Sequence, residues 1–564
     1  MKKGLVKLLS VILCGLMLFT GFTACGGKNP GSGEIEKEDA SKTQLYVYNF
    51  NGGYGSEWLK NVKRRFEAAY DDTEFEPGTG KRGVQVIIDN TKSGNVTIEE
   101  TIGSSHDEVF FLELASMQSL IRKGLLLDIT DAITEPLTEF GETKSIEDKM
   151  YDQQKTWYGK DGKYYGVPHY AAFWGIIYNV DLFDKNMLYY SDRPAINDGF
   201  IISDTDKRSA GPDGEYDTYD DGLPATYEDF YKLCARMVNM GIVPFTWTGK
   251  YLEYVDGTIC SNLWADHEGA EQISLIYNMN GTATDIVTSF TQEGVPVTES
   301  VNIGNANAYR LYQQAGAYYA LSFLEKIISE GWYTSGSFIN TQSHLLAQAD
   351  FLYSDIIPGR DKIAFLADGC WWLEEANSVF EEMTQLYGES ASRQNRNFAW
   401  LPLPKATSAD IGKKGAIVDT NWSACFVNAN VSAEKKDLTK LFVRFCNTDE
   451  SLAEFSISTN TTKALRYTLT EDQYDRLTTY GKSIYETQTR RDLTFSYSTN
   501  PLFTNNTSAF FWGDQWQSIV NGESYNRVTR AIKNYGVTAR QFFDGMKNYY
   551  TASRWQSSYA DYIN

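Results

Sequence analysis

The chain has 564 residues, too many for one ordinary core, since single domains rarely exceed about 250–300 residues. An apolar fraction of 42% with 22% charged residues is typical of a folded globular protein and argues against a disordered one. The net charge of −21 repels phosphate backbones, which argues against nucleic acid as a partner. The 37 Tyr and 13 Trp suit surfaces that hold partly polar ligands.

The N-terminus predicts export. Lys2, Lys3 and Lys7 precede an apolar run over 8–22, the order found in a secretory signal peptide. The sequence FTAC at 22–25 resembles the bacterial lipobox, which implies a signal peptide over 1–24 and a lipidated Cys25. Residues 25–42 then form a flexible polar linker. We expect a lipid-anchored protein on the extracytoplasmic face of a cell membrane, on a Gram-positive type of surface. No later apolar run is long enough to span a bilayer.

The cysteines show no spacing that would predict a set of disulfide bonds. Apart from Cys25 and one in the signal peptide, five remain, an odd number without CxxC spacing. This favours buried free thiols over disulfides or zinc. They are Cys234, Cys260, Cys370, Cys425 and Cys446.

The first ordered segment predicts alternating strands and helices. Strands are expected at 45–50, 84–88 and 108–112, and helices at 58–70, with Ser56 at its start, and at 116–123. This order predicts a parallel sheet, because parallel neighbours need a long return connection. Ligands of such sheets bind beyond the carboxyl ends of the strands. The glycine-rich loop 51–55, which carries Tyr54, follows one such end and is either a ligand loop or an ordinary turn.

Motifs further along resemble a known family. GKYYGVP at 162–168, GIIYN at 175–179 and DLF at 181–183 resemble the first crossing of extracellular solute-binding proteins (family 1 type), which feed carbohydrate ABC importers. Weaker matches follow in the expected order at 224–230, 363–371, 398–404 and 432–450. Relative to compact members, 190–223 and much of 270–308 are extra, and the chain beyond 492 matches only loosely.

The resemblance implies an α/β, two-lobed periplasmic-binding-protein-like (type II) fold with a hinge and a central cleft. Its lobes are discontinuous. Lobe 1 would comprise 43–168 plus 413–488, and lobe 2 would comprise 169–412 plus 489–564, with an acidic insertion at 190–223. The hinge crossings are expected near 168–171, 405–415 and 485–492.

A sugar site needs flat rings for the C–H face of the sugar and polar groups for its hydroxyl rim. The resemblance places Trp174, Trp371, Trp372 and Trp422 at ligand-contacting positions, with Asp107, Asp368 and Asn421 as hydrogen-bonding partners. Further candidates are Trp247, Tyr254 and Tyr54. The alternative for each ring is a place in a lobe core. Two adjacent Trp on one strand would face opposite sides, which favours Trp371 or Trp372 in the cleft.

Signatures of catalysis are missing from the sequence. It contains no HExxH, GxSxG, Walker or dinucleotide-binding motif, and its four His are scattered. His169 is the exception, since it follows Pro168 at the predicted crossing and could face the cleft. We therefore expect a binding protein rather than an enzyme, with no required cofactor.

The acidic insertion allows a structural calcium site. Asp213, Asp217, Asp220 and Asp221 alternate with turn-forming residues, and calcium prefers oxygen ligands from such loops. The spacing does not fit an EF-hand, so a plain solvated loop is the alternative.

The sequence thus predicts a monomer that captures a sugar or oligosaccharide and delivers it to ABC permease subunits. Three alternatives stay open. The protein could bind surface glycans as an adhesin or sensor input without transport. It could bind a non-sugar solute such as a peptide with the same fold. It could also be a surface glycan hydrolase or lyase.

Overall fold

The structure is a computed structural model that describes residues 36–90, 101–193, 196–497, 499–500 and 516–563. The predicted signal peptide, Cys25 and most of the linker lie outside these residues. Within the described residues, no helix is long and apolar enough to cross a membrane. The five remaining cysteines are free and buried, as predicted.

Lobe 1 is built on a five-stranded sheet with the order β2-β1-β3-β14-β6. Its strands are β1 (Thr43–Asn49), β2 (Val84–Asp89), β3 (Val109–Leu112), β14 (Ala424–Val427) and β6 (Val167–Pro168). β1 pairs in parallel with β2 and β3, as the sequence predicts, and β14 runs antiparallel to β3 and β6. β14 comes from a distant part of the chain, so the lobe is discontinuous.

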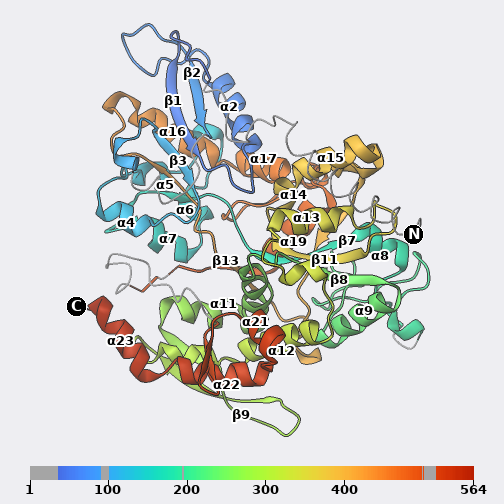
Figure 1. The fold of residues 1–564 in the computed structure, drawn as a ribbon. Coiled ribbons are helices and arrows are strands. Elements are labelled where there is room, and N and C mark those ends of the chain that lie inside the picture. The colour runs from blue at the N-terminus through green and yellow to red at the C-terminus, as the bar shows by residue number, and fades with distance from the viewer. Residues whose placement is uncertain (1–35, 91–100, 194–195, 498, 501–515, 564) are drawn as a thin grey trace, which may run out of the picture.

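Helices cover the lobe 1 sheet (Figure 1). α2 (Glu57–Ala69) begins after Ser56, whose side chain makes no cap bond, and buries Trp58, Leu59 and Phe66 on one face. α4 (Met117–Arg122), α5 (Thr130–Thr134), α6 (Ile146–Lys149) and α7 (Asp152–Tyr158) follow along the chain. α16 (Lys436–Cys446) and α17 (Asp449–Thr459) join them from the C-terminal half.

Lobe 2 contains a four-stranded sheet with the order β12-β7-β11-β8. Its strands are β7 (Trp174–Asn179), β8 (Ile242–Thr246), β11 (Lys362–Gly369) and β12 (Phe398–Trp400). Its helices include α8 (Val180–Asn186), α9 (Tyr227–Asn239), α11 (Asn262–Asn278), α12 (Ala315–Ser329), α13 (His344–Tyr353), α14 (Trp372–Glu375) and α15 (Asn377–Tyr387). An antiparallel hairpin, β9 (Gly281–Phe290) and β10 (Pro296–Ile303), occupies the region that is extra relative to compact members.

The hinge region contains a parallel pair, β13 (Ala416–Asp419) and β15 (Asp492–Phe495). β13 lies between the two groups of elements in Figure 1. The helix before β15, α19 (Thr479–Arg490), packs on lobe 2, because Ser483 Oγ accepts the Trp400 N–H and Tyr480 Oη donates to the Cys370 carbonyl. The predicted lobe limit at 488 assigns this helix to lobe 1.

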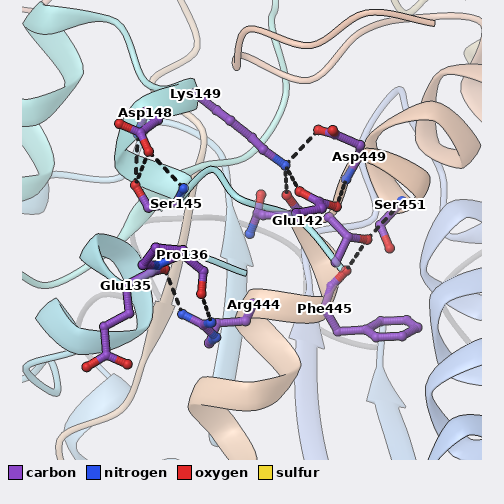
Figure 2. A network of polar contacts seen from close by, with 12 residues as sticks. Glu135, Pro136, Glu142, Ser145, Asp148, Lys149, Arg444, Phe445, Asp449 and Ser451 are labelled. Atoms are coloured by element: carbon purple, nitrogen blue, oxygen red, sulfur yellow. Dashed lines mark hydrogen bonds and ion pairs between the residues drawn. The ribbon is translucent and has the colours of Figure 1, made fainter. Parts of the chain in front are cut away.

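Ion pairs tie the two sequence segments of lobe 1 together (Figure 2). Lys149 is 1% exposed, and its Nζ binds Glu142 Oε2 at 2.6 Å, Asp449 Oδ1 at 2.7 Å and the Asn447 carbonyl at 2.9 Å. Arg444 donates to the carbonyls of Glu135 and Pro136. Segment 130–150 is therefore fixed to α16 and α17.

Replacing Lys149 with Met should destabilise the protein by about 1.5–3 kcal/mol, the usual worth of hydrogen bonds to a charged group. The control is Lys155→Met, since Lys155 makes only an exposed pair with Asp152 at 3.6 Å. Denaturant unfolding of both variants measures the difference. Equal stabilities would contradict the structural role of Lys149.

Candidate ligand site between the lobes

Each sheet has one edge at which its parallel strands end, where ligands of such sheets bind. These two ligand edges face each other. β1, β3 and β6 end at one edge of the lobe 1 sheet, where β14 begins. β8, β11 and β12 end at one edge of the lobe 2 sheet, where β7 begins. The loop after β1 meets the loop after β11, since Tyr54 Oη lies 3.2 Å from Cys370 Sγ. We call the meeting of these loops (50–55, 113–116, 169–174, 369–371 and 420–423) the strand-end junction.

Three aromatic rings of lobe 2 gather at the strand-end junction. Trp174 lies edge-to-face with Trp371, at 4.7 Å between ring centroids, and with Tyr254, at 4.2 Å. Trp174 Nε1 donates to Thr420 Oγ1 at 2.9 Å, which fixes this ring to the hinge. Trp371 is 7% exposed, and the other two rings are partly buried. The structure thus brings together three predicted site residues from separate parts of the chain.

The lobes approach closely because position 53 is a glycine. A Cβ at Gly53 would lie 2.2 Å from Trp371 Cδ1. This is far shorter than a van der Waals contact, so no larger residue fits there without moving the ring. Tyr54 follows, 4% exposed, stacked on Tyr170 with ring centroids 3.9 Å apart and donating to the Ala171 carbonyl at 2.8 Å. Tyr54 therefore braces the loop against the crossing and exposes little ring surface here.

Carboxylates lie beside the aromatic rings. Asp368, at the end of β11, is 1% exposed and accepts from its neighbour Gly369 N–H and from Gln348 Nε2. The same Nε2 donates to Glu375 Oε2 at 2.6 Å. Burial raises the pKa of the Asp368 carboxyl well above its usual range, and the charge of Glu375 adds to the shift.

Glu113 is a further carboxylate at the strand-end junction, and it was not among the predicted site residues. It directly follows β3, and burial raises its pKa to about 7, with further upward shifts from the charges of Glu375 and Asp419. Charges from lobe 2 and from the hinge therefore both act on Glu113. Its position at the carboxyl end of a buried parallel strand was the signal available in the sequence.

Asn421 and Trp422 form the turn through which the chain re-enters lobe 1. Trp422 has a φ of 45° and donates from Nε1 to Ser496 Oγ at 2.8 Å. The Asn421 carbonyl accepts the Leu114 N–H at 2.6 Å. Both residues are partly buried at the strand-end junction.

His169 also lies near this edge, but it packs inside lobe 1. It is 2% exposed, and its Nδ1 is 2.6 Å from Lys463 Nζ. Its ring lies 4.6 Å from that of Trp58 and 4.8 Å from that of Phe111. Burial, and then the Lys463 charge, lower the pKa of His169 well below its usual value. His169 is therefore a neutral residue of the lobe 1 core in this structure.

Two predicted tryptophans are fully buried, and one predicted aspartate lies at the other edge of the lobe 1 sheet. Trp247 and Trp372 are both 0% exposed, so neither offers a ring face to a ligand in this structure. Trp372 opens α14 after β11 has ended, so the strand alternation assumed for the Trp pair does not apply. Asp107 precedes β3 and lies at the opposite edge of the sheet, where it accepts from Ser105 Oγ. The ligand roles of these three residues stay predictions that their places in this structure do not support.

The carboxylates of the acidic insertion accept hydrogen bonds from N–H groups of their own loop. Asp220 Oδ2 accepts the Asp213 N–H at 3.1 Å, and Asp221 Oδ2 accepts the Asp217 N–H at 2.9 Å. Burial raises the pKa of Asp220 to about 7. Among the described residues, these four do not form a group with ligand atoms close enough to share an ion. Calcium binding there stays a prediction.

A cavity of 790 Å³ lies at another place between the lobes. Its walls include Tyr151 and Arg466 from lobe 1, Ser274 of α11, and Leu493 of β15. None of the predicted site residues lines it. The lobe contact at Trp371 and this cavity are therefore separate features of the interface.

The comparisons with known proteins agree with this geometry. Residues 75–480 match the family of bacterial extracellular solute-binding proteins, and the chain belongs to that family. Among solved structures it is similar to a chitin oligosaccharide binding protein, with 14% identity, a TM-score of 0.51, and coverage of 92% of this chain and 100% of the other. It is also similar to the solute-binding protein RafE in complex with raffinose, with 12% identity, a TM-score of 0.52, and coverage of 90% and 99%. No curated relative matches the sequence.

These matches confirm the predicted family and the mixed α/β fold of two-lobed solute-binding proteins. The lobe limits and the ligand role of each site residue stay predictions. The lipid anchor and the permease are likewise untested.

A substitution at Gly53 tests the lobe contact. Gly53→Val should hold the lobes apart, because its side chain would overlap the Trp371 ring. We expect a larger radius of gyration by small-angle X-ray scattering and an unfolding midpoint close to that of the parent. Gly304→Val is the control, since a Cβ at Gly304 meets nothing within 4 Å. An unchanged radius for Gly53→Val would contradict the contact.

Lys463 gives a pH-dependent prediction. Burial lowers its pKa from 10.5 to about 8, so between these values the unfolded chain holds more protons than the folded one. Stability then rises with pH over this window, and below pH 8 the folded state bears the full cost of the buried charge. Lys463→Met should raise the Tm at pH 7 and raise it less at pH 10. An equal change in Tm at both pH values would show that the Lys463 charge does not cause it. The control is Lys60→Met, at an exposed position.

Proposed function

We propose that this protein captures a sugar or oligosaccharide between its lobes and delivers it to the permease of an ABC importer. The observation that carries the proposal is the group of Trp174, Tyr254 and Trp371 beside the carboxylates of Glu113, Asp368 and Glu375. Aromatic rings can cover the apolar face of a pyranose, and carboxylates can accept hydrogen bonds from its hydroxyls. The names of the two similar structures, which refer to chitin oligosaccharide and raffinose, support the same class of ligand.

Membrane attachment through Cys25 belongs to the proposal. The basic start, the apolar run over 8–22 and the lipobox-like FTAC support it. A tether of this kind would keep the binding protein near its permease, which raises their effective concentration. We also propose that the protein has no catalytic activity of its own and acts as a monomer.

The experiment is isothermal titration calorimetry against neutral oligosaccharides, including chitin oligosaccharides and raffinose, and against peptides. Trp371→Ala should weaken saccharide binding at least about tenfold, or about 1.4 kcal/mol, because it removes a ring from the junction. Trp332→Ala is the matched control, because that ring is similarly buried, at 6% against 7%, and packs beside α12.

Each outcome separates the alternatives. If Trp371→Ala bound the saccharide as tightly as the parent, the aromatic group would not be part of the ligand site. Binding of peptides alone would favour a non-sugar solute, and chain shortening of the oligosaccharide would favour an enzyme. Saccharide binding without loss of uptake in cells lacking the protein would favour the adhesin or sensor function.

A further inference from the structure

A histidine and two carboxylates meet in lobe 2, away from the strand-end junction. His267 and Glu268 are consecutive on α11, and Asp285 lies on β9. One ligand atom from each residue lies within 4.8 Å of the others. Among the residues that the structure describes, this is the group of His, Cys, Asp and Glu side chains that could hold a metal ion.

Polar atoms around this group are buried without partners. His267 Nδ1 and Asp285 Oδ1 are inaccessible to solvent and make no hydrogen bond. The nearest carboxylate to that nitrogen is Asp410 Oδ2, at 3.9 Å, which is too far for a hydrogen bond. Buried polar atoms are normally satisfied, and each exception costs about 1–3 kcal/mol.

Gln314 supplies an independent observation. It is 0% exposed, and its Nε2 donates to Glu268 Oε2 at 3.2 Å, while its Oε1 has no partner. The same Nε2 also lies 3.4 Å from the Gln272 carbonyl, so the amide donates while its own acceptor is unsatisfied. The other oxygen, Glu268 Oε1, accepts the Gly316 N–H at 2.8 Å, at the start of α12.

The electrostatics point the same way. Ligand atoms of Glu268 and Asp285 lie within 4.8 Å of each other. Two partly buried carboxylates at this separation repel each other unless a proton or a cation lies between them. A divalent cation would satisfy both carboxylates together with the unpartnered atoms of His267 and Gln314.

We propose that His267, Glu268 and Asp285 bind a divalent cation of the zinc class, with Gln314 Oε1 as a further donor. One imidazole nitrogen with carboxylate oxygens suits Zn²⁺, whereas Ca²⁺ requires six to eight oxygen ligands. A tetrahedral ion about 2.1 Å from each donor would bring the ligand atoms to about 3.4 Å apart. The side chains would reach this separation by rotating about their own bonds.

The ion would join three elements. Glu268 lies immediately before the break in α11 at Gly269, which has a φ of 76°, and Asp285 anchors the exposed β9–β10 hairpin. Gln314 precedes α12. Binding would therefore fasten the hairpin to both helices, and because it favours the folded state it would raise the stability.

The experiment uses untagged mature protein, stripped with EDTA and titrated with Zn²⁺ in the calorimeter. We expect one Zn²⁺ per chain and a rise in Tm, and Co²⁺ in its place should show the visible absorption of a four-coordinate site. Asp285→Asn should weaken Zn²⁺ binding at least tenfold. His267→Gln, a second variant, should do the same and should remove the nitrogen ligand from the Co²⁺ spectrum.

Asp213→Asn, in the acidic insertion, is the matched control and should bind Zn²⁺ like the parent. Failure of the stripped parent to take up Zn²⁺ would overturn the proposal, as would parent-like affinity in both Asp285→Asn and His267→Gln. Loss of the metal in Asp213→Asn alone would place the ion in the acidic insertion instead.

Discussion

The contact on which the two-lobed arrangement depends is the buried carboxylate of Asp419. It is 2% exposed and accepts the N–H of Ala172, in the first crossing, and of Asn421, in the second. Its strand, β13, pairs with β15, which carries the third crossing. The Asp419 side chain thus joins the first crossing to the second, and the backbone pairing of β13 with β15 joins the second to the third. These contacts and the Tyr54 contact with Cys370 hold the strand ends of the two sheets together.

The same carboxylate contributes to the electrostatics of the strand-end junction. Burial raises the pKa of Asp419 to about 7, and its charge in turn raises the pKa of Glu113. Glu375 Oε1, in the same group of carboxylates, lies 3.6 Å from His344 Nε2. Closing the lobes therefore concentrates like charges. Hydroxyl groups of a ligand would donate to these carboxylates, which lowers the cost of closure.

The strand–helix order of lobe 1 was predictable because its strands are short buried runs separated by amphipathic segments. The family motifs gave expected positions for the crossings, and these positions stay predictions together with the lobe limits. The side chains were harder to assign. Asp107 and Glu113 lie six residues apart at opposite ends of β3, and only the direction of the strand tells which one faces the other lobe. Likewise, Trp371 and Trp372 are adjacent but lie in different environments, because β11 ends just before them.

Aromatic content was a poor guide to the site for a related reason. Besides Trp371, nine of the 13 tryptophans are buried in the two cores: Trp58, Trp157, Trp247, Trp264, Trp332, Trp372, Trp400, Trp516 and Trp555. The rings at the strand-end junction differ from these core tryptophans in their position near strand ends that face the other lobe. Trp371 packs against Gly53, so a saccharide that covers this face of the ring must displace that contact. A ligand can stabilise closure only by the difference between its contacts and those that it displaces. The affinity of the site therefore depends on how much of the Trp371 face a saccharide can take over from the Gly53 loop.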